Sequence, residues 1–301
     1  MIDILEGKFF KTFIAVMEEK SFNRAAEKLG FVQSTVTNHI QLLERACGQK
    51  LFHRLSRGVT PTEAGLKLAK FAHQFVHLGQ SLEEAMNEST EPKGIIHLSM
   101  HESFFVTRMS SLLQQFKLKF PKVNFKMETG YHQDIIDDVL QHVVDFGIIP
   151  RNPRRDDLQF FPIIKEELIF IASEELTKNV ERNGLNVLSN ESVITFGNSC
   201  LYHTHAIKIL DEAGVETDHA IQYPSIEMIK QAVKCGIGFA LIPKIAAEKE
   251  IVEGSFGALP LSPGIFPTHG LIVNKDRDLN LPSQMFKSFV LNHYAFQSDS
   301  H

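Results

Sequence analysis

Cysteine is scarce in this chain, with three residues in 301. Cys47, Cys200 and Cys235 are odd in number and lack the close pairing of a metal motif, so they predict neither a disulfide framework nor a zinc site. The expectation is a reduced protein of the cytoplasm.

Long apolar runs are also missing. No window approaches the roughly 18 uninterrupted apolar residues that indicate a membrane span. The N-terminal stretch MIDILEGKFFKTF has neither the basic start nor the long apolar core of a signal peptide. We therefore expect no membrane partner.

A strong net charge is absent as well, since the formal value is −5. This value argues against a protein that coats nucleic acid with its whole surface. Residues 1–60 nevertheless carry nine Lys or Arg against six Asp or Glu, whereas the rest of the chain carries 22 against 30. The modest positive excess therefore lies at the N-terminal end.

Residues 21–44, SFNRAAEKLGFVQSTVTNHIQLLE, have the pattern of two short helices joined by a tight turn. Ser21 suits an N-cap, and Gly30 stands where a helix end needs a left-handed residue. A second helix begins near Gln33, with Val36 and Ile40 facing inward. Its outward residues are Gln33, Ser34, Thr35, Thr37, Asn38 and His39. Such an edge suits a DNA major groove, although a helical hairpin with a solvated face has the same spacing.

A longer pattern extends this stretch in one ungapped run. Its members are Ser21-Phe22, Ala25-Ala26, Leu29, Gln33-Ser34, Val36, Ile40, Leu43-Glu44, Gly48, Leu51-Phe52, Arg54, Thr60 and Thr62-Glu63-Ala64-Gly65. On these residues the chain resembles the winged helix-turn-helix of LysR-type transcriptional regulators. Thr37 and Asn38 stand where members often have Ser and Arg, and Pro61 stands where Leu is common. We expect the first difference to change which operator is read.

The resemblance implies DNA contacts from the helix-turn-helix and from a wing with its turn at Ser56-Arg57-Gly58. The expected DNA-binding residues are Ser21, Gln33, Ser34, Thr35, Thr37, Asn38, His39, Arg54 and Arg57. Arg57 can reach phosphates or the adjacent minor groove. For Arg54, an internal ion pair with Glu44 or another carboxylate is the alternative.

Residues 62–87 predict a long helix whose apolar residues recur in steps of four and three. They are Ala64, Leu68, Phe71, Phe75, Leu78, Leu82 and Ala85. A seam of this length predicts a two-stranded coiled coil, whereas a helix packed on its own domain is the alternative. In the family this helix pairs two subunits, so Leu68, Phe71, Phe75, Leu78 and Leu82 are expected to dimerise a homodimer or homotetramer.

From Ile95 onward, strand and helix patterns alternate, which predicts parallel sheets covered on both faces. The resemblance implies a domain like periplasmic binding proteins, with two α/β lobes and two crossovers, so the fold class is α/β overall with an all-α winged helix-turn-helix. The expected domains are the winged helix-turn-helix at 1–61, a linker helix at 62–88, a hinge at 89–94 and an effector-binding domain at 95–301. Its lobes are expected near 95–165 with 267–301, and near 166–266.

Polar residues follow several of the expected strands, where α/β sheets bind ligands. The expected effector-binding residues are His101, Glu102, Ser103, Thr129, Asn198, Ser199, Cys200, His203 and Ser225. Hydroxyls and free helix N–H groups suit a carboxylate or another small anion, whereas plain caps and turns are the alternative. His203 stands where many members have Arg, which weakens a site of fixed positive charge.

The sequence as a whole favours a DNA-binding regulator controlled by a small-molecule effector, with no enzyme activity and no cofactor. Its expected partners are a double-stranded operator, the effector and a second copy, with RNA polymerase as a candidate. One alternative is a sensor on the same scaffold that uses the Cys200 thiol or a metal at His203-x-His205 or His97-x-x-x-His101. The other is a small-molecule-binding protein or enzyme with an N-terminal dimerisation module.

Overall fold

The computed structural model describes residues 6–86, 91–217, 219–261 and 266–298. Two compact units divide the chain, namely Met1–Pro92 with Leu140–Val144, and Lys93–Val139 with Asp145–His301. The expected end of the linker helix at Asn87, and residues 89 and 90 of the expected hinge, lie outside the described residues. Within the described ranges, none of the helices combines the length and apolar character that crossing a membrane requires.

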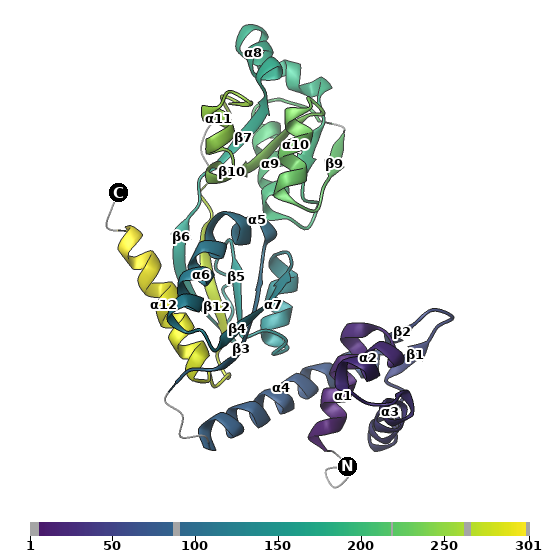
Figure 1. Ribbon diagram of the computed structural model, residues 1–301. Helices are drawn as coiled ribbons and strands as arrows, with labels where there is room; N and C mark the ends of the chain where they lie inside the picture. Colours follow the sequence, from purple (N-terminus) through teal and green to yellow (C-terminus); the bar gives the residue numbers. More distant parts are fainter. Residues whose placement is uncertain (1–5, 87–90, 218, 262–265, 299–301) are drawn as a thin grey trace. The chain divides into compact units, whose positions relative to one another are not determined.

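Helices and one β-hairpin form the N-terminal unit (Figure 1). They are α1 Gly7–Glu19, α2 Phe22–Leu29, α3 Gln33–Cys47, β1 Phe52–Arg54, β2 Val59–Pro61 and α4 Glu63–Met86. Apolar side chains at helical spacing meet in a common core, where Phe13, Val36 and Leu43 are fully buried. The winged helix-turn-helix predicted from the sequence is confirmed.

Local signals fix the bounds of α2 and of the hairpin. The Ser21 hydroxyl accepts the N–H of Arg24, and Gly30 ends α2 with φ 68°. Gly58 closes the turn between β1 and β2 with φ 85°. A Cβ at this position would lie 2.7 Å from the carbonyl oxygen of Lys20, so only glycine fits.

Two five-stranded sheets form the C-terminal unit (Figure 1). The first has the order β4 Val123–Thr129, β3 Gly94–Met100, β5 Phe146–Ile149, β12 Thr268–Asn274, β6 Leu158–Lys165. The second has the order β11 Phe256–Ala258, β7 Leu168–Ser173, β10 Phe239–Pro243, β8 Val193–Thr195, β9 Ala220–Gln222. The chain passes from the first sheet to the second between β6 and β7, and it returns between β11 and β12.

The prediction of parallel sheets was wrong, because both sheets are mixed. Strands β3, β4 and β5 are parallel, but β12 runs antiparallel to both β5 and β6. In the second sheet β7 runs antiparallel to β10 and β11. The reversed strands are β7 and β12, and each is the first strand after a crossover. Strand–helix alternation predicts the strand direction only where consecutive strands lie in the same lobe. It does not predict the direction of a strand that the chain enters from the other lobe.

Strand β6 was not predicted, and Pro162 explains why, since proline within a run argues against a central strand. Here β6 is an edge strand, and its pairing with β12 shifts register between His269 and Gly270, where Gly270 faces Pro162. An edge with an irregular register accommodates a residue that has no N–H. Strands β9 and β11 were also missed, as were α8 Glu174–Asn183 and α11 Glu248–Val252.

The remaining helices are α5 Glu102–Phe104, η2 Phe105–Met109, α6 Ser110–Lys119, α7 His132–Leu140, η3 Leu185–Asn190, α9 Leu201–Glu212, α10 Ile226–Lys234, η4 Lys244–Ala246 and α12 Leu281–Ser298. Of these, α5, η2 and α6 follow one another directly, and η2 is π-helical.

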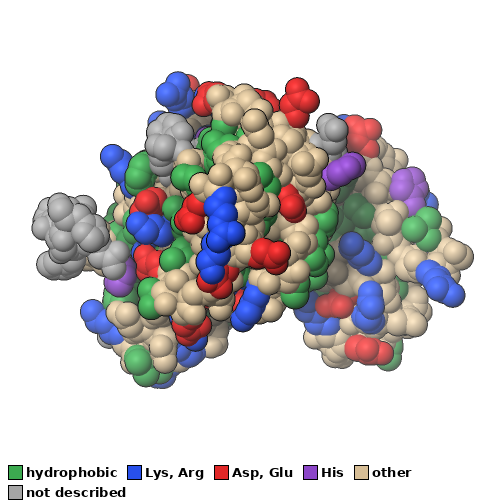
Figure 2. All heavy atoms as spheres, turned by 90° about the horizontal axis from the view of Figure 1, so that it is seen from above, with side chains coloured by type: hydrophobic (Ala, Val, Ile, Leu, Met, Phe, Trp, Pro, Cys, Tyr) green, Lys and Arg blue, Asp and Glu red, His purple; other side chains and the backbone are tan. Residues whose placement is uncertain are grey.

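Each lobe of the C-terminal unit has its own apolar core. Helices α6 and α12 cover the first sheet, where the Phe116 ring meets the Phe286 ring edge-on at 5.3 Å between centroids. Phe239 and Ile242 of β10 are fully buried in the second core. Outside these cores, acidic and basic side chains are interspersed over the face seen in Figure 2, which agrees with the weakly acidic composition beyond residue 60.

Two glycines of α4 predict opposite effects on stability. A Cβ at Gly65 would lie 2.2 Å from the Leu51 carbonyl oxygen, whereas a Cβ at Gly79 has nothing within 4 Å. We expect Gly65→Ala to lower the free energy of unfolding by about 1–3 kcal/mol through overpacking. Gly79→Ala, the matched control, should raise it by up to about 1 kcal/mol through helix propensity.

Chemical denaturation followed by circular dichroism measures both glycine variants. If Gly65→Ala were as stable as Gly79→Ala, the close approach of α4 to Leu51 would be wrong.

Candidate DNA-reading edge and effector cavity

The first turns of α3 present a polar edge to solvent. Gln33, Ser34 and Asn38 are exposed, and Thr35 and Thr37 are half-buried. The Gln33 amide donates to the Thr37 hydroxyl at 2.8 Å. Because buried residues on the opposite side of α3 anchor the helix in the core, this edge is held rigidly with its hydrogen-bonding groups outward.

His39 does not belong to this edge, which corrects the expectation that it faces outward. Its side chain is 7% exposed, and its Nδ1 lies 2.9 Å from the Thr12 hydroxyl of α1. The imidazole packs against the rings of Phe9 and Phe31, and its burial lowers the His39 pKa. His39 is therefore a core residue that joins α3 to α1.

The wing carries Arg57 at its exposed turn, as predicted. Arg54 is also exposed, and its guanidinium lies over the Phe22 ring at 5.2 Å from the centroid. Glu44 forms its ion pair with Lys50, at 2.7 Å, which leaves no support for the alternative Arg54–Glu44 pair. The Ser21 hydroxyl is engaged as the cap of α2.

One side of α4 exposes a row of large apolar side chains. Phe71, Phe75, Leu78 and Leu82 are 60%, 44%, 67% and 62% exposed. Leu68 is half-buried and packs against the core of the N-terminal unit. The Ala85 side chain, the last member of the expected seam, lies outside the described part of α4.

In the C-terminal unit, a small cavity of about 20 Å³ lies among residues from both lobes. His101 reaches it from the end of β3, Cys200 and Tyr202 from the start of α9, and His269 from β12. Tyr131 lines it too, and its hydroxyl donates to the Phe196 carbonyl at 2.5 Å. The convergence of the segments after β3, β4 and β8 agrees with the sequence prediction.

Hydrogen bonds connect the polar groups around the cavity. Nδ1 of His101 accepts the Ser103 N–H, so Nε2 carries the proton and faces the Cys200 sulfur at 3.7 Å. The Tyr202 hydroxyl lies 3.4 Å from Nε2 of His269. Burial lowers the pKa of His101 to about 4 and that of His269 to about 3. Both imidazoles are therefore neutral hydrogen-bonding groups near pH 7.

Of the nine residues predicted to bind the effector, His101 and Cys200 line the cavity. Ser103 is fully buried, and its hydroxyl lies 2.7 Å from Nδ1 of His101, so it supports the imidazole from behind. Glu102 accepts the N–H of Ile226 at the start of α10.

Ser225 also acts at the start of α10, where its hydroxyl accepts the Met228 N–H as the helix cap. Thr129, Asn198 and Ser199 are exposed, and His203 is half-buried with Nδ1 unpaired among the described residues. The alternative of caps and turn residues thus describes Ser225.

A wider groove of about 690 Å³ shares His132, Pro150 and Leu201 with the cavity. Its charged lining comes from the segment after β5, with Arg151 and Arg154, and His205 reaches it from α9. The sequence analysis did not select these residues. The run Arg151-Asn152-Pro153-Arg154 follows a predicted strand directly, so the rule applied to other strand ends would have found it.

Both parts of the chain match models of known protein families. Residues 8–66 match the family described as "Bacterial regulatory helix-turn-helix protein, lysR family", and residues 89–295 match the "LysR substrate binding domain". The chain belongs to the LysR family of bacterial transcriptional regulators. The resemblance seen in the sequence is confirmed, and it extends over both units.

Individual relatives of this LysR-type regulator agree. The HTH-type transcriptional regulator YofA of Bacillus subtilis is 30% identical over 81% of this chain and 83% of its own. Full-length LysG from Corynebacterium glutamicum, solved with bound effector Arg, has a TM-score of 0.65 at 17% identity and covers 97% of this chain and 99% of its own. CbnR complexed with its target DNA has a TM-score of 0.65 at 16% identity, with coverages of 96% and 100%. The two structures show a shared fold.

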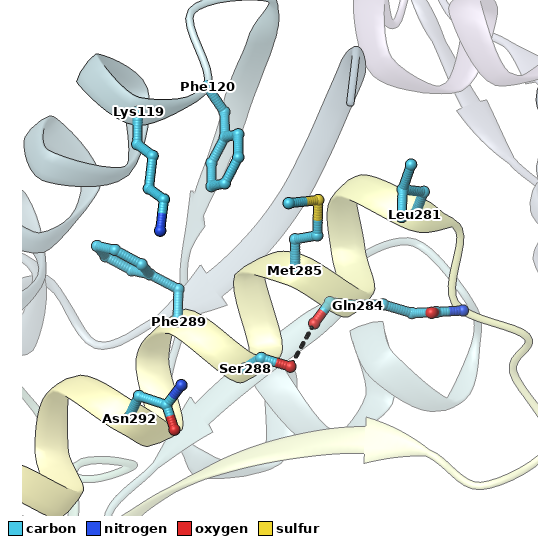
Figure 3. Close-up of a pocket in the computed structure, with 8 residues that line it drawn as sticks. All are labelled: Lys119, Phe120, Leu281, Gln284, Met285, Ser288, Phe289 and Asn292. Carbon is cyan, nitrogen blue, oxygen red and sulfur yellow. Dashed lines mark hydrogen bonds between the residues drawn. The ribbon is translucent and has the colours of Figure 1, made fainter. Parts of the chain in front are cut away.

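Another hollow of this LysR-type regulator, of about 350 Å³, lies between the end of α6 and α12 (Figure 3). Phe120, Met285 and Phe289 line it, and the Ser288 hydroxyl donates to the Gln284 carbonyl at its rim. No residue that the sequence predicted as functional lines this hollow.

The geometry argues against the alternatives that use a thiol or a metal. Burial raises the pKa of Cys200 to about 11, although the N–H groups of Tyr202 and His203 oppose the shift. A thiol with this pKa is a poor nucleophile near neutral pH. Among the described residues, no group of three or more His, Cys, Asp or Glu side chains could hold a metal ion.

Cys200 should therefore resist alkylation in the folded regulator. Iodoacetamide at mildly alkaline pH should label the exposed Cys235 first, because burial lowers the thiolate fraction of Cys200 roughly a hundredfold below that of an ordinary thiol. Mass spectrometry of peptides over time gives both rates in one sample. Labelling of Cys200 at the rate of Cys235 would restore the thiol-sensor alternative.

Proposed function

We propose that this LysR-type regulator reads its operator with the exposed edge of α3, supported by the Arg57 wing. The observation that carries the proposal is the rigid edge itself, where Gln33, Ser34 and Asn38 are exposed on a helix whose other side is buried. In the major groove an Asn or Gln side chain pairs with adenine, and short hydroxyls pair with several bases. The CbnR complex with target DNA provides a precedent for this fold.

Phosphate contacts supply most of the salt-dependent affinity in such a complex. Arg57 is exposed at the turn of the wing, where it can reach a phosphate or the minor groove. Binding to a chromosomal operator implies a cytoplasmic location, with RNA polymerase as a candidate partner at the promoter.

Operator binding is tested with full-length protein and DNA from upstream of its own gene over a series of salt concentrations. A steep fall in affinity with salt, together with preference over random duplex, is the expected result. Equal affinity for both DNAs, with and without cell extract as a source of effector, would contradict the proposal.

Alanine substitutions in the exposed edge of α3 should weaken the preference for the operator over random DNA. Thr35→Ala and Asn38→Ala should each cost about 1–3 kcal/mol of preference for the operator over random DNA, because each removes a base contact. Gln41→Ala is the matched control, since Gln41 is exposed on the same helix outside this edge. Fluorescence anisotropy with both DNAs measures the preference. If neither variant differed from Gln41→Ala, the edge would be placed wrongly.

We further propose that α4 pairs two copies of the chain through Phe71, Phe75, Leu78 and Leu82. These side chains follow a heptad spacing and are 44–67% exposed in the single chain. Pairing with the same helix of a second copy would cover this apolar surface. A dimer places two α3 edges on one DNA and so accounts for a two-fold operator. A tetramer of two such dimers is compatible with the same helix contact.

Leu78→Glu should shift the protein from dimer to monomer, because a charge in the seam loses apolar contact and must be desolvated. Lys70→Glu changes an exposed residue of α4 outside the seam and should leave the dimer intact. Sedimentation velocity over a dilution series measures the oligomeric state. A Leu78→Glu protein that sediments like the unmodified dimer would exclude α4 as the pairing helix.

The cavity of the C-terminal unit and the groove beside it together form the proposed effector site. LysG, which shares the fold, was solved with its effector. An effector changes operator binding only if it binds one arrangement of the protein more tightly than another. A site lined from both lobes meets this condition, because its shape depends on how the lobes are placed around it.

A further inference from the structure

We propose that the effector is a small anionic molecule with an apolar body, which lies in the groove beside the cavity and is bound through Arg151 and Arg154. The inference rests on the proposed function, because it assigns a ligand class to the effector site. It differs from the expectation drawn from the sequence, which placed an anion among hydroxyls and helix N–H groups at the strand ends and the start of the Ser225 helix.

Space places the body of the ligand in the groove. The cavity of about 20 Å³ holds roughly one water molecule or a single small group. The groove has about 690 Å³ and shares His132, Pro150 and Leu201 with the cavity. A ligand in the groove can therefore place one group against the buried imidazoles.

Charge determines the ligand class. Arg151 and Arg154 line the groove, and neither forms a salt bridge within the described part of the chain. Arg155, their neighbour outside the groove lining, is neutralised by Asp157 at 2.7 Å. None of the groove-lining side chains that the structure describes is acidic. Two guanidinium groups without a carboxylate partner among the described residues favour a carboxylate or another oxyanion.

Unpaired imidazole nitrogens support the same assignment. Arg151 donates from Nε to Nε2 of His132 at 3.4 Å, and since a guanidinium has no acceptor, His132 must carry its proton on Nδ1. That Nδ1 is buried and has no partner among the described residues. Nδ1 of His269, whose side chain is 1% exposed, is also unpaired. A buried donor without a partner is costly, and a small shift of the lining that admits a ligand oxygen to Nδ1 of His132 would satisfy it.

The apolar walls of the groove indicate that the ligand has an apolar body. They include Pro150, Pro153, Phe160, Leu201 and Pro267. Apolar side chains beside two cations select a molecule with both an apolar body and a negative group. A strongly hydrated anion such as inorganic phosphate would leave this apolar surface uncovered.

Three probes of similar size and different charge test the ligand class on the full-length protein. They are phenylacetate, phenylacetamide and phenylethylammonium, which are anionic, neutral and cationic. Isothermal titration calorimetry should give an affinity for phenylacetate about tenfold or more above that of either other probe. Failure of phenylacetate to bind more strongly than both, including no binding at all, overturns the proposal.

Arginine variants locate the binding. Arg151→Gln and Arg154→Gln should each weaken phenylacetate binding by about tenfold and leave phenylacetamide binding unchanged. Arg155→Gln is the matched control, because it removes the same charge from the same segment but from an arginine paired with Asp157. A loss in Arg155→Gln equal to that in the other two would show general electrostatic attraction and reject a site at Arg151 and Arg154.

Operator affinity measured on the same preparations separates this inference from the proposed function. Specific operator binding combined with preference for the neutral or cationic probe rejects the anionic class and keeps the regulator. Preference for phenylacetate without specific operator binding keeps the ligand class and rejects the DNA-reading function.

Discussion

A buried ion pair joins the two crossover segments beside the proposed effector site. Arg108 of η2 donates to Glu166 from Nε at 3.1 Å and from Nη2 at 2.8 Å, and the Glu166 side chain is 2% exposed. The Glu166 N–H donates to the Pro267 carbonyl at 2.9 Å, so one residue joins both crossover segments. Removing one partner of such a pair costs about 3–5 kcal/mol. His269 follows Pro267 by two residues, so its position in the cavity depends on this link.

Around the proposed effector site, the buried imidazoles are neutral and the exposed guanidinium groups are cationic. His101 and His269 are held neutral inside, where a charge would be expensive, and so they can only exchange hydrogen bonds with a ligand. Arg151 and Arg154 lie exposed in the groove, and the arginine side chain is a permanent cation. The proposed DNA-reading edge of α3 also depends on burial. His39 is buried in the core, whereas Gln33, Ser34 and Asn38 are exposed, so their hydrogen-bonding groups are available to a partner.

The N-terminal unit could be predicted almost residue by residue because its signals are local. A cap at Ser21, a left-handed glycine at Gly30 and a helical apolar period each depend on residues within one or two turns. The C-terminal unit could be predicted only in outline. Strand β6 contains Pro162 and forms through pairing with β12, more than a hundred residues away, so no local pattern reveals it. The antiparallel direction of β12 has the same origin.

The sequence by itself determined the helix-turn-helix, the wing, the apolar row of α4 and the α/β character of the rest, because propensity, capping and periodicity are encoded in neighbouring residues. Only the tertiary structure decided which polar side chains form the sites. His39 turned inward because Thr12, 27 positions earlier, offers its hydroxyl. Cys200 meets His101 across 99 positions, at a cavity that exists only where the two lobes meet. Whether a polar side chain is buried or exposed depends on such partners, which are distant in the sequence. The pattern of neighbouring residues does not reveal them.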